Sequence, residues 1–135
     1  MFRGSSYNTL DGKHRVKIPS RYVDILRGNQ ETHLVLTTFE GYLLAYPQST
    51  WAQEEQKLLE LDPFKAENRD HIRKLSSKAE DCFLDRQGRV VIPQALREHA
   101  KICNNVVVVG MISHFEIWDR ERYEAYRKEQ EGPGN

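Results

Sequence analysis

The chain has 135 residues, of which 30% are charged and 39% hydrophobic, and its formal net charge is zero. This composition is typical of a folded globular domain and excludes a disordered chain. No apolar run reaches the roughly 18 residues of a membrane helix, and the first residues lack the apolar centre of a signal peptide. We therefore expect a cytoplasmic protein with no membrane partner.

One sequence pattern occurs twice. Asp-x-x-x-Arg-Val-x-Ile-Pro is found at Asp11–Pro19 and again at Asp85–Pro93. Asp and Gly favour a turn, while Val and Ile favour a strand, which Pro often ends. We predict that each repeat opens with a hairpin whose turn, at 11–14 or at 85–88, is capped by the Asp side chain. In the strand that follows each turn, the Val and Ile should enter the core and leave the Arg outside.

The elements that follow each motif also repeat in order. A short helix comes first, then strands at 33–38 and 42–46 in the first half and at 106–111 and 115–118 in the second. Each half therefore has the order β-β-α-β-β, which predicts a β-rich α+β fold. Half of a chain this long would be marginal alone, so we expect the two halves to share one core.

The pattern of residues 51–75 predicts a helical connector, which would join a first module at 1–50 to a second module at 76–135. Thr50 and Gln53 have the spacing of a capping box, and Asp62-Pro63 is typical of a helix start. Apolar side chains should line one face of these helices. They are Trp51, Leu58, Leu59, Phe64, Ile72 and Leu75.

A last helix is predicted from about residue 119. Its Tyr123 and Tyr126 would pack either on the core or on a neighbouring subunit. The final residues, 131–135, should form a short mobile tail.

Charge follows the repeat. Residues 1–27 contain six Lys/Arg and two Asp/Glu, and residues 69–103 contain eight and five, whereas the segment after each is acidic. A basic face can therefore exist on a neutral chain, which favours double-stranded DNA as a partner. Arg grips a phosphate or pairs with guanine, and Lys suits phosphate. The candidate DNA-binding residues are Lys13, His14, Arg15, Lys17 and Arg89.

No metal, cofactor or catalytic site is predicted. The five histidines lack metal-ligand spacing, and Cys82 and Cys103 are expected to be structural thiols. Asp11, His14 and Arg15 could be imagined as acid–base groups, but no nucleophile or cofactor motif joins them. We therefore expect a protein that is not an enzyme and carries no cofactor.

These residues resemble the MraZ family over essentially the whole chain. The match comprises the opening Met-Phe-Arg-Gly, both D-x-x-x-R-x-x-x-P motifs and Arg21-Tyr22. The resemblance implies two tandem SpoVT-AbrB modules that form an interlocked swapped-hairpin barrel, and a closed ring of protomers. It also implies a nucleoid-associated regulator that binds repeated promoter boxes upstream of the division and cell-wall gene cluster. The DNA-contacting arginine of the family falls on Arg15 and, by repeat symmetry, on Arg89.

The chain departs from the family pattern at the first turn, where His14 stands in place of Gly. Gly at a turn commonly serves a positive φ, which His adopts at a cost. His14 is either a tolerated substitution or, when protonated, an added donor near phosphate. In the second copy Gln87 and Val91 replace Lys13 and Lys17. We therefore expect the first copy to contribute more affinity.

Two other functions are compatible with the repeat. An AbrB-type antitoxin would also bind a toxin through a disordered tail, but only about five residues follow the last predicted helix. A protein-interaction ring would keep the apolar face and lose the basic turns, which this chain retains.

Overall fold

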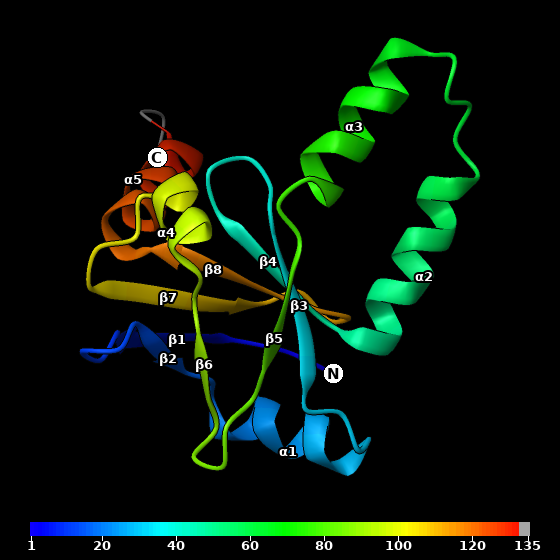
Figure 1. Cartoon of the computed structure of the whole chain (residues 1–135). Helices are drawn as coiled ribbons and strands as arrows, with labels where there is room; N and C mark the ends of the chain where they lie inside the picture. The colour runs from blue at the N-terminus through cyan, green and yellow to red at the C-terminus, as the bar shows by residue number, and fades with distance from the viewer. Residues whose placement is uncertain (133–135) are drawn as a thin grey trace.

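The computed structural model describes residues 1–132 (Figure 1). Of the predicted tail, Glu131 is the last residue of a helix, and 133–135 lie outside the described residues. The first half consists of β1 (Ser5–Thr9), β2 (Arg15–Lys17), α1 (Ser20–Gly28), β3 (His33–Thr38) and β4 (Leu43–Pro47). Two helices follow, α2 (Gln48–Leu59) and α3 (Ala66–Ser76). The second half consists of β5 (Glu80–Phe83), β6 (Arg89–Val91), α4 (Gln94–Ala100), β7 (Asn105–Gly110), β8 (Phe115–Asp119) and α5 (Arg120–Glu131).

The strand order interlocks the two halves. A six-stranded sheet has the order β1-β7-β8-β4-β3-β5, and β2 pairs with β6 in a separate two-stranded sheet. All of these pairs are antiparallel. β1 of the first half thus pairs in the second half with β7, and β5 of the second half pairs in the first half with β3. The predicted α+β fold, with swapped strands and added helices, is confirmed.

The turn at 11–14 joins β1 to β2, but each of these two strands forms its backbone hydrogen bonds with a strand of the other half. β1 pairs with β7 and β2 pairs with β6. The same holds for β5 and β6 around the second turn. The two strands of each predicted hairpin therefore pair with strands of the other half and not with each other, so neither half can complete its hydrogen bonding alone.

Both halves contribute to a single main core. The Val and Ile of the first motif, Val16 and Ile18, are 0% and 1% exposed, and their counterparts Val90 and Ile92 are 1% and 0% exposed. All four belong to one apolar cluster that also holds Tyr22 and Phe115. The predicted shared core is confirmed. Because burial of such side chains stabilises by roughly 1.5–3 kcal/mol each, this cluster ties the two repeats together.

The opening residues of the chain are fixed to α1. The Phe2 ring packs edge-on against Tyr22, with 5.2 Å between ring centroids. The Tyr22 hydroxyl donates to the carbonyls of Arg3 and Gly4 at 2.8 and 2.9 Å. The Met-Phe-Arg-Gly start and the Arg21-Tyr22 pair therefore have a shared structural role.

α2 and α3 project from the sheet as a helical arm, defined here as residues 48–76 (Figure 1). The predicted start of each helix is wrong. α2 begins at Gln48 with no side-chain cap, so Thr50 lies inside the helix. Asp62 accepts a bond from the Phe64 N–H in a turn before α3, which begins only at Ala66. None of the helices in residues 1–132 is long and apolar enough to cross a bilayer.

Candidate nucleic-acid interface

β2 and β6 form a short antiparallel ribbon, called here the β2–β6 ribbon. It comprises residues 15–17 and 89–91 with their preceding turns, 11–14 and 85–88. Opposite one another lie Arg15 and Val91, Val16 and Val90, and Lys17 and Arg89. Because the central valines are buried, the other four side chains share the outward face. The two repeats thus place their arginines on one surface.

Two further backbone bonds extend the ribbon into its turns. The Ile18 N–H donates to the Gly88 carbonyl at 2.9 Å, and the Ile92 N–H donates to the His14 carbonyl at 3.0 Å. Each turn is therefore tied to the strand of the other repeat.

The Asp side chains cap the two turns, as predicted. Asp11 Oδ1 accepts from the backbone N–H groups of Lys13 and Arg15 at 2.9 and 3.0 Å. Asp85 Oδ1 does the same for Gln87 and Arg89 at 2.9 and 2.8 Å. The residue before each Arg has a positive φ, 60° at His14 and 76° at Gly88. The left-handed conformation expected at His14 is confirmed.

The same carboxylates hold the arginine side chains through their second oxygen. Arg15 Nε donates to Asp11 Oδ2 at 2.7 Å, and Arg89 Nε donates to Asp85 Oδ2 at 3.0 Å. Arg89 Nη1 also lies 3.6 Å from Asp11 Oδ2. Within residues 1–132, the terminal nitrogens of Arg15 have no hydrogen-bonding partner, so one edge of this guanidinium is free to bind a ligand.

Hydrogen bonding keeps both carboxylates ionised. The Arg15 N–H is the main reason that the pKa of Asp11 falls to about 2, and the Arg15 side chain and the Lys13 N–H add to it against partial desolvation. The pKa of Asp85 is also lowered, chiefly by the Arg89 N–H. Near neutral pH each Asp therefore remains an acceptor for its Arg.

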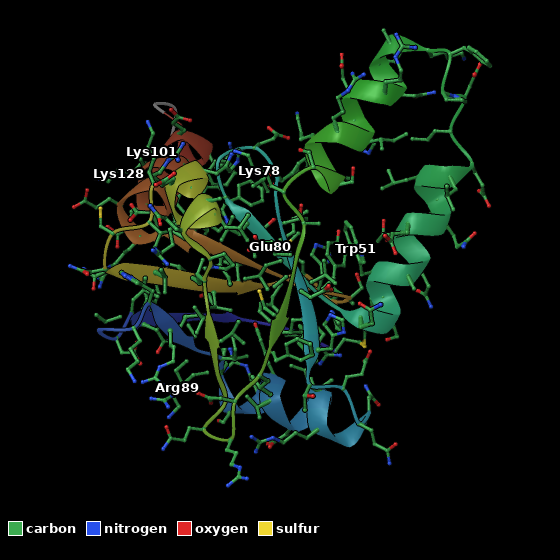
Figure 2. The ribbon with its side chains drawn as sticks, viewed as in Figure 1. Trp51, Lys78, Glu80, Arg89, Lys101 and Lys128 are labelled. Carbon is green, nitrogen blue, oxygen red and sulfur yellow. The ribbon has the colours of Figure 1, made fainter. Side chains whose placement is uncertain are left out.

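The remaining predicted residues lie around this face. Lys13, His14 and Lys17 are exposed. The structure shows Arg89 on the side of the molecule opposite the helical arm (Figure 2).

An exposed Arg86, which the sequence analysis missed, occupies the position of Gly12 in the repeat. An alignment of the two turns position by position reveals it. Counted over turn and strand together, the second copy therefore has one fewer Lys or Arg than the first, rather than two.

No metal centre accompanies this face. The described part of the chain, residues 1–132, contains no group of three or more His, Cys, Asp or Glu side chains that could hold a metal ion. Of the two cysteines, Cys82 is buried and Cys103 is exposed. Burial, with nearby Glu80 and Asp81, raises the pKa of the Cys82 thiol to about 11, which suits a structural thiol.

A family model described as "MraZ protein, putative antitoxin-like" matches the chain twice, at residues 1–74 and 75–133. Several curated proteins named Transcriptional regulator MraZ are similar over nearly the full chain. The protein from Syntrophobacter fumaroxidans is 38% identical over 127 residues, which are 94% of this chain and 85% of that protein. The protein from Moorella thermoacetica is 41% identical over 130 residues (96% and 88%). The protein from Pseudomonas syringae pv. syringae is 39% identical over 127 residues (93% and 84%).

The name shared by these relatives is not that of an enzyme class. The two successive matches to one family model agree with the tandem repeat in the fold. With this match and this coverage, the chain belongs to the MraZ family, whose relatives named above are transcriptional regulators.

Proposed function

We propose that this protein is a sequence-specific DNA-binding transcriptional regulator that binds DNA through the outward face of the β2–β6 ribbon. The observation that carries this proposal is that Arg15, Lys17 and Arg89 share one face of a two-stranded ribbon. The major groove of B-DNA admits such a ribbon. The names of the relatives support the same class of function.

The chemistry of the face suits DNA. Each Arg is held through Nε by an Asp, so a guanidinium edge is oriented before DNA arrives. That edge can pair with O6 and N7 of guanine or grip a phosphate. Lys13, Lys17 and His14 surround the arginines as phosphate contacts. Pre-orientation reduces the entropy lost on binding.

We further propose that several protomers act together in a closed ring. The chain is neutral overall, and one ribbon carries few cations, so a single contact should bind modestly. Linking several contacts to repeated DNA boxes would raise the apparent affinity by roughly 10²–10⁴-fold. The boxes would lie upstream of the division and cell-wall gene cluster, in a region that includes the promoter of this gene. The protein would then be associated with the nucleoid in the cytoplasm.

The helical arm supports such an assembly because two of its large apolar side chains are uncovered. Leu59 is 76% exposed and Phe64 is 90% exposed. Between α2 and α3 lies a groove of about 390 Å³ whose apolar lining includes Trp51, Leu58, Leu59 and Ile72. Figure 2 shows Trp51 at the base of this arm. In this proposal residues 1–50 and 76–135 are the DNA-binding modules, and the connector at 51–75 contacts a neighbouring subunit.

The test is a fluorescence-anisotropy titration with the DNA just upstream of this gene and a scrambled duplex of equal length. The wild-type protein should prefer the upstream duplex, and its affinity should fall with salt in proportion to the phosphates contacted. Arg15→Ala should remove most of that preference without changing the size of the assembly. Equal binding of both duplexes would refute the proposal and favour a protein-interaction ring, to which the exposed arm also points.

A further inference from the structure

Arg27, near the end of α1, bonds to the second turn of the ribbon. Its Nη2 donates to the carbonyls of Arg86 and Asp85 at 2.8 and 3.3 Å. α1 belongs to the first half and the turn to the second, so these bonds cross between the repeats. We propose that Arg27 is a positioning residue that fixes the second turn and thereby the direction in which Arg89 meets DNA. This inference rests on the proposed function.

The path from Arg27 to Arg89 passes through Asp85. Arg27 holds the main chain of Asp85, and the Asp85 carboxylate accepts both the backbone N–H and the Nε of Arg89. A shift of the Asp85 main chain would therefore move the acceptor that orients the Arg89 guanidinium. Bidentate pairing with a base demands a fixed orientation, whereas nonspecific phosphate attraction does not.

Close packing beneath the same turn supports this role. Val23 of α1 is 6% exposed. A Cβ added at Gly88 would lie 3.1 Å from Val23 Cγ2, and Gly88 has a φ of 76°. The second turn is therefore seated directly on α1, with Val23 beneath it and Arg27 bonded to its carbonyls.

The first turn lacks the equivalent support. The position 74 residues after Arg27 is Lys101, which caps α4 in a left-handed conformation. In the part of the chain that the structure describes, no side chain donates to the carbonyls of Asp11 or Gly12. The second turn is thus braced by a side chain of the other repeat, whereas the first is held across the repeats by the backbone bond from Ile92. We expect the braced turn to be preformed and the other to adjust on DNA.

Arg27→Ala is the variant that tests this role, and Lys101→Ala is its matched control from the other repeat. Ala suits the last turn of a helix, so the fold should be kept, which thermal unfolding checks. Arg27→Ala should weaken binding to the upstream duplex by about ten-fold, the effect of losing a charged hydrogen bond, and leave the scrambled duplex unchanged. Lys101→Ala should weaken neither. An equal loss on both duplexes, with a salt slope smaller by about one, would make Arg27 a phosphate contact and overturn the inference.

A measurement without DNA separates this inference from the proposed function. Millisecond hydrogen–deuterium exchange should be faster in Arg27→Ala at the Gln87 and Gly88 amides, and unchanged around Lys13. Unchanged exchange at Gln87 and Gly88 would show that Arg27 braces nothing, even if the wild type binds DNA specifically. Faster exchange in a protein without preference for the upstream duplex would instead retain the brace and refute the DNA-binding function.

Discussion

One carboxylate in each repeat explains the spacing between its Asp and its Arg. Asp11 Oδ1 closes the turn through two backbone N–H groups, and Oδ2 accepts Arg15 Nε. For one Asp side chain to make these three hydrogen bonds, the Arg must lie four residues after it, where the turn brings the chain back beside the carboxylate. As an isolated surface ion pair, the contact would add little to the stability of the fold. Its value lies in orienting the guanidinium.

The lowered pKa of Asp11 predicts how stability changes in acid. The folded pKa is about 2, against an ordinary value of 3.8. The contribution of Asp11 should therefore be complete above about pH 4 and be lost as the pH falls toward 2. Urea unfolding of the wild type and Asp11→Asn should differ at pH 6, and the difference should shrink between pH 4 and 2. A difference that stays constant across this range would contradict the assignment.

His14 provides a second residue-scale prediction. It lies exposed in the first turn, beside Arg15. If protonated His14 donates to phosphate, wild-type affinity should rise between about pH 7.5 and 5.5, and His14→Gly should lose this rise. His71→Gln, on α3, is the control and should keep it. An unchanged profile in His14→Gly would identify His14 as a tolerated turn substitution.

Individual residue roles were predictable where local chemistry determines them. The burial of Val16 and Ile18 follows from strand alternation, and the positive φ at His14 follows from the turn. Arg27 could not be predicted because its partners, Asp85 and Arg86, are more than fifty residues away and depend on the tertiary fold. The choice of Lys13, His14, Lys17 and the two arginines as DNA contacts stays a prediction.

At the scale of elements, the β2–β6 ribbon has an unequal charge on its two strands. Val91 stands opposite Arg15 and occupies the repeat position of Lys17. It is 49% exposed, so a Lys there would point to solvent at a cost of up to about 1 kcal/mol from the facing Arg.

Val91→Lys should make the salt dependence of DNA binding steeper by about 0.9 in log–log slope and strengthen binding to both duplexes. Val91→Gln is the matched control and should leave the slope unchanged. The slopes come from anisotropy titrations at several salt concentrations. No change with Lys would mean that this face does not meet phosphate.

The elements themselves were predictable, but their partners and some boundaries were not. The order β-β-α-β-β follows from periodicity and turn residues, and β3 at His33–Thr38 matches its predicted range. Alternation shows which face of a strand is buried and not which strand lies beside it, so the pairing of β1 with β7 needed the fold. The predicted start of α2 was wrong because Pro47 is the N-cap of this helix, three residues before the Thr50 of the expected capping box.

At the scale of the whole molecule, the strand exchange makes one body from two repeats. The order β1-β7-β8-β4-β3-β5 reads the same from both ends when equivalent strands are exchanged. The β2–β6 and β4–β8 pairs lie at the centre of this symmetry. A shared core was predictable from length, because half the chain has too little surface to bury. α2, which follows β4, has α5 after β8 as its counterpart, but α3 has none. The arm at residues 48–76 is left with Leu59 and Phe64 uncovered.

The uncovered arm predicts how the assembly can be disrupted. Leu59→Ser/Phe64→Ser should give a smaller species in light scattering, because it removes apolar surface that a second copy would bury. Both side chains are already exposed, so the melting temperature should change little. Lys57→Ser, on α2 like Leu59, is the control and should keep the wild-type mass. An unchanged mass in the double variant would place the subunit contact elsewhere.

The most direct test of the reading surface is a double-mutant cycle with Arg15→Ala and Arg89→Ala. Anisotropy titrations would use the upstream duplex, with the scrambled duplex as reference. Each single variant should lose about 1–3 kcal/mol of binding free energy. The double variant should lose less than the sum, by at least about 0.5 kcal/mol, because Arg89 reaches Asp11 and both arginines lie on one ribbon. Wild-type affinity in Arg89→Ala, or strictly additive losses, would contradict a single surface built from both repeats.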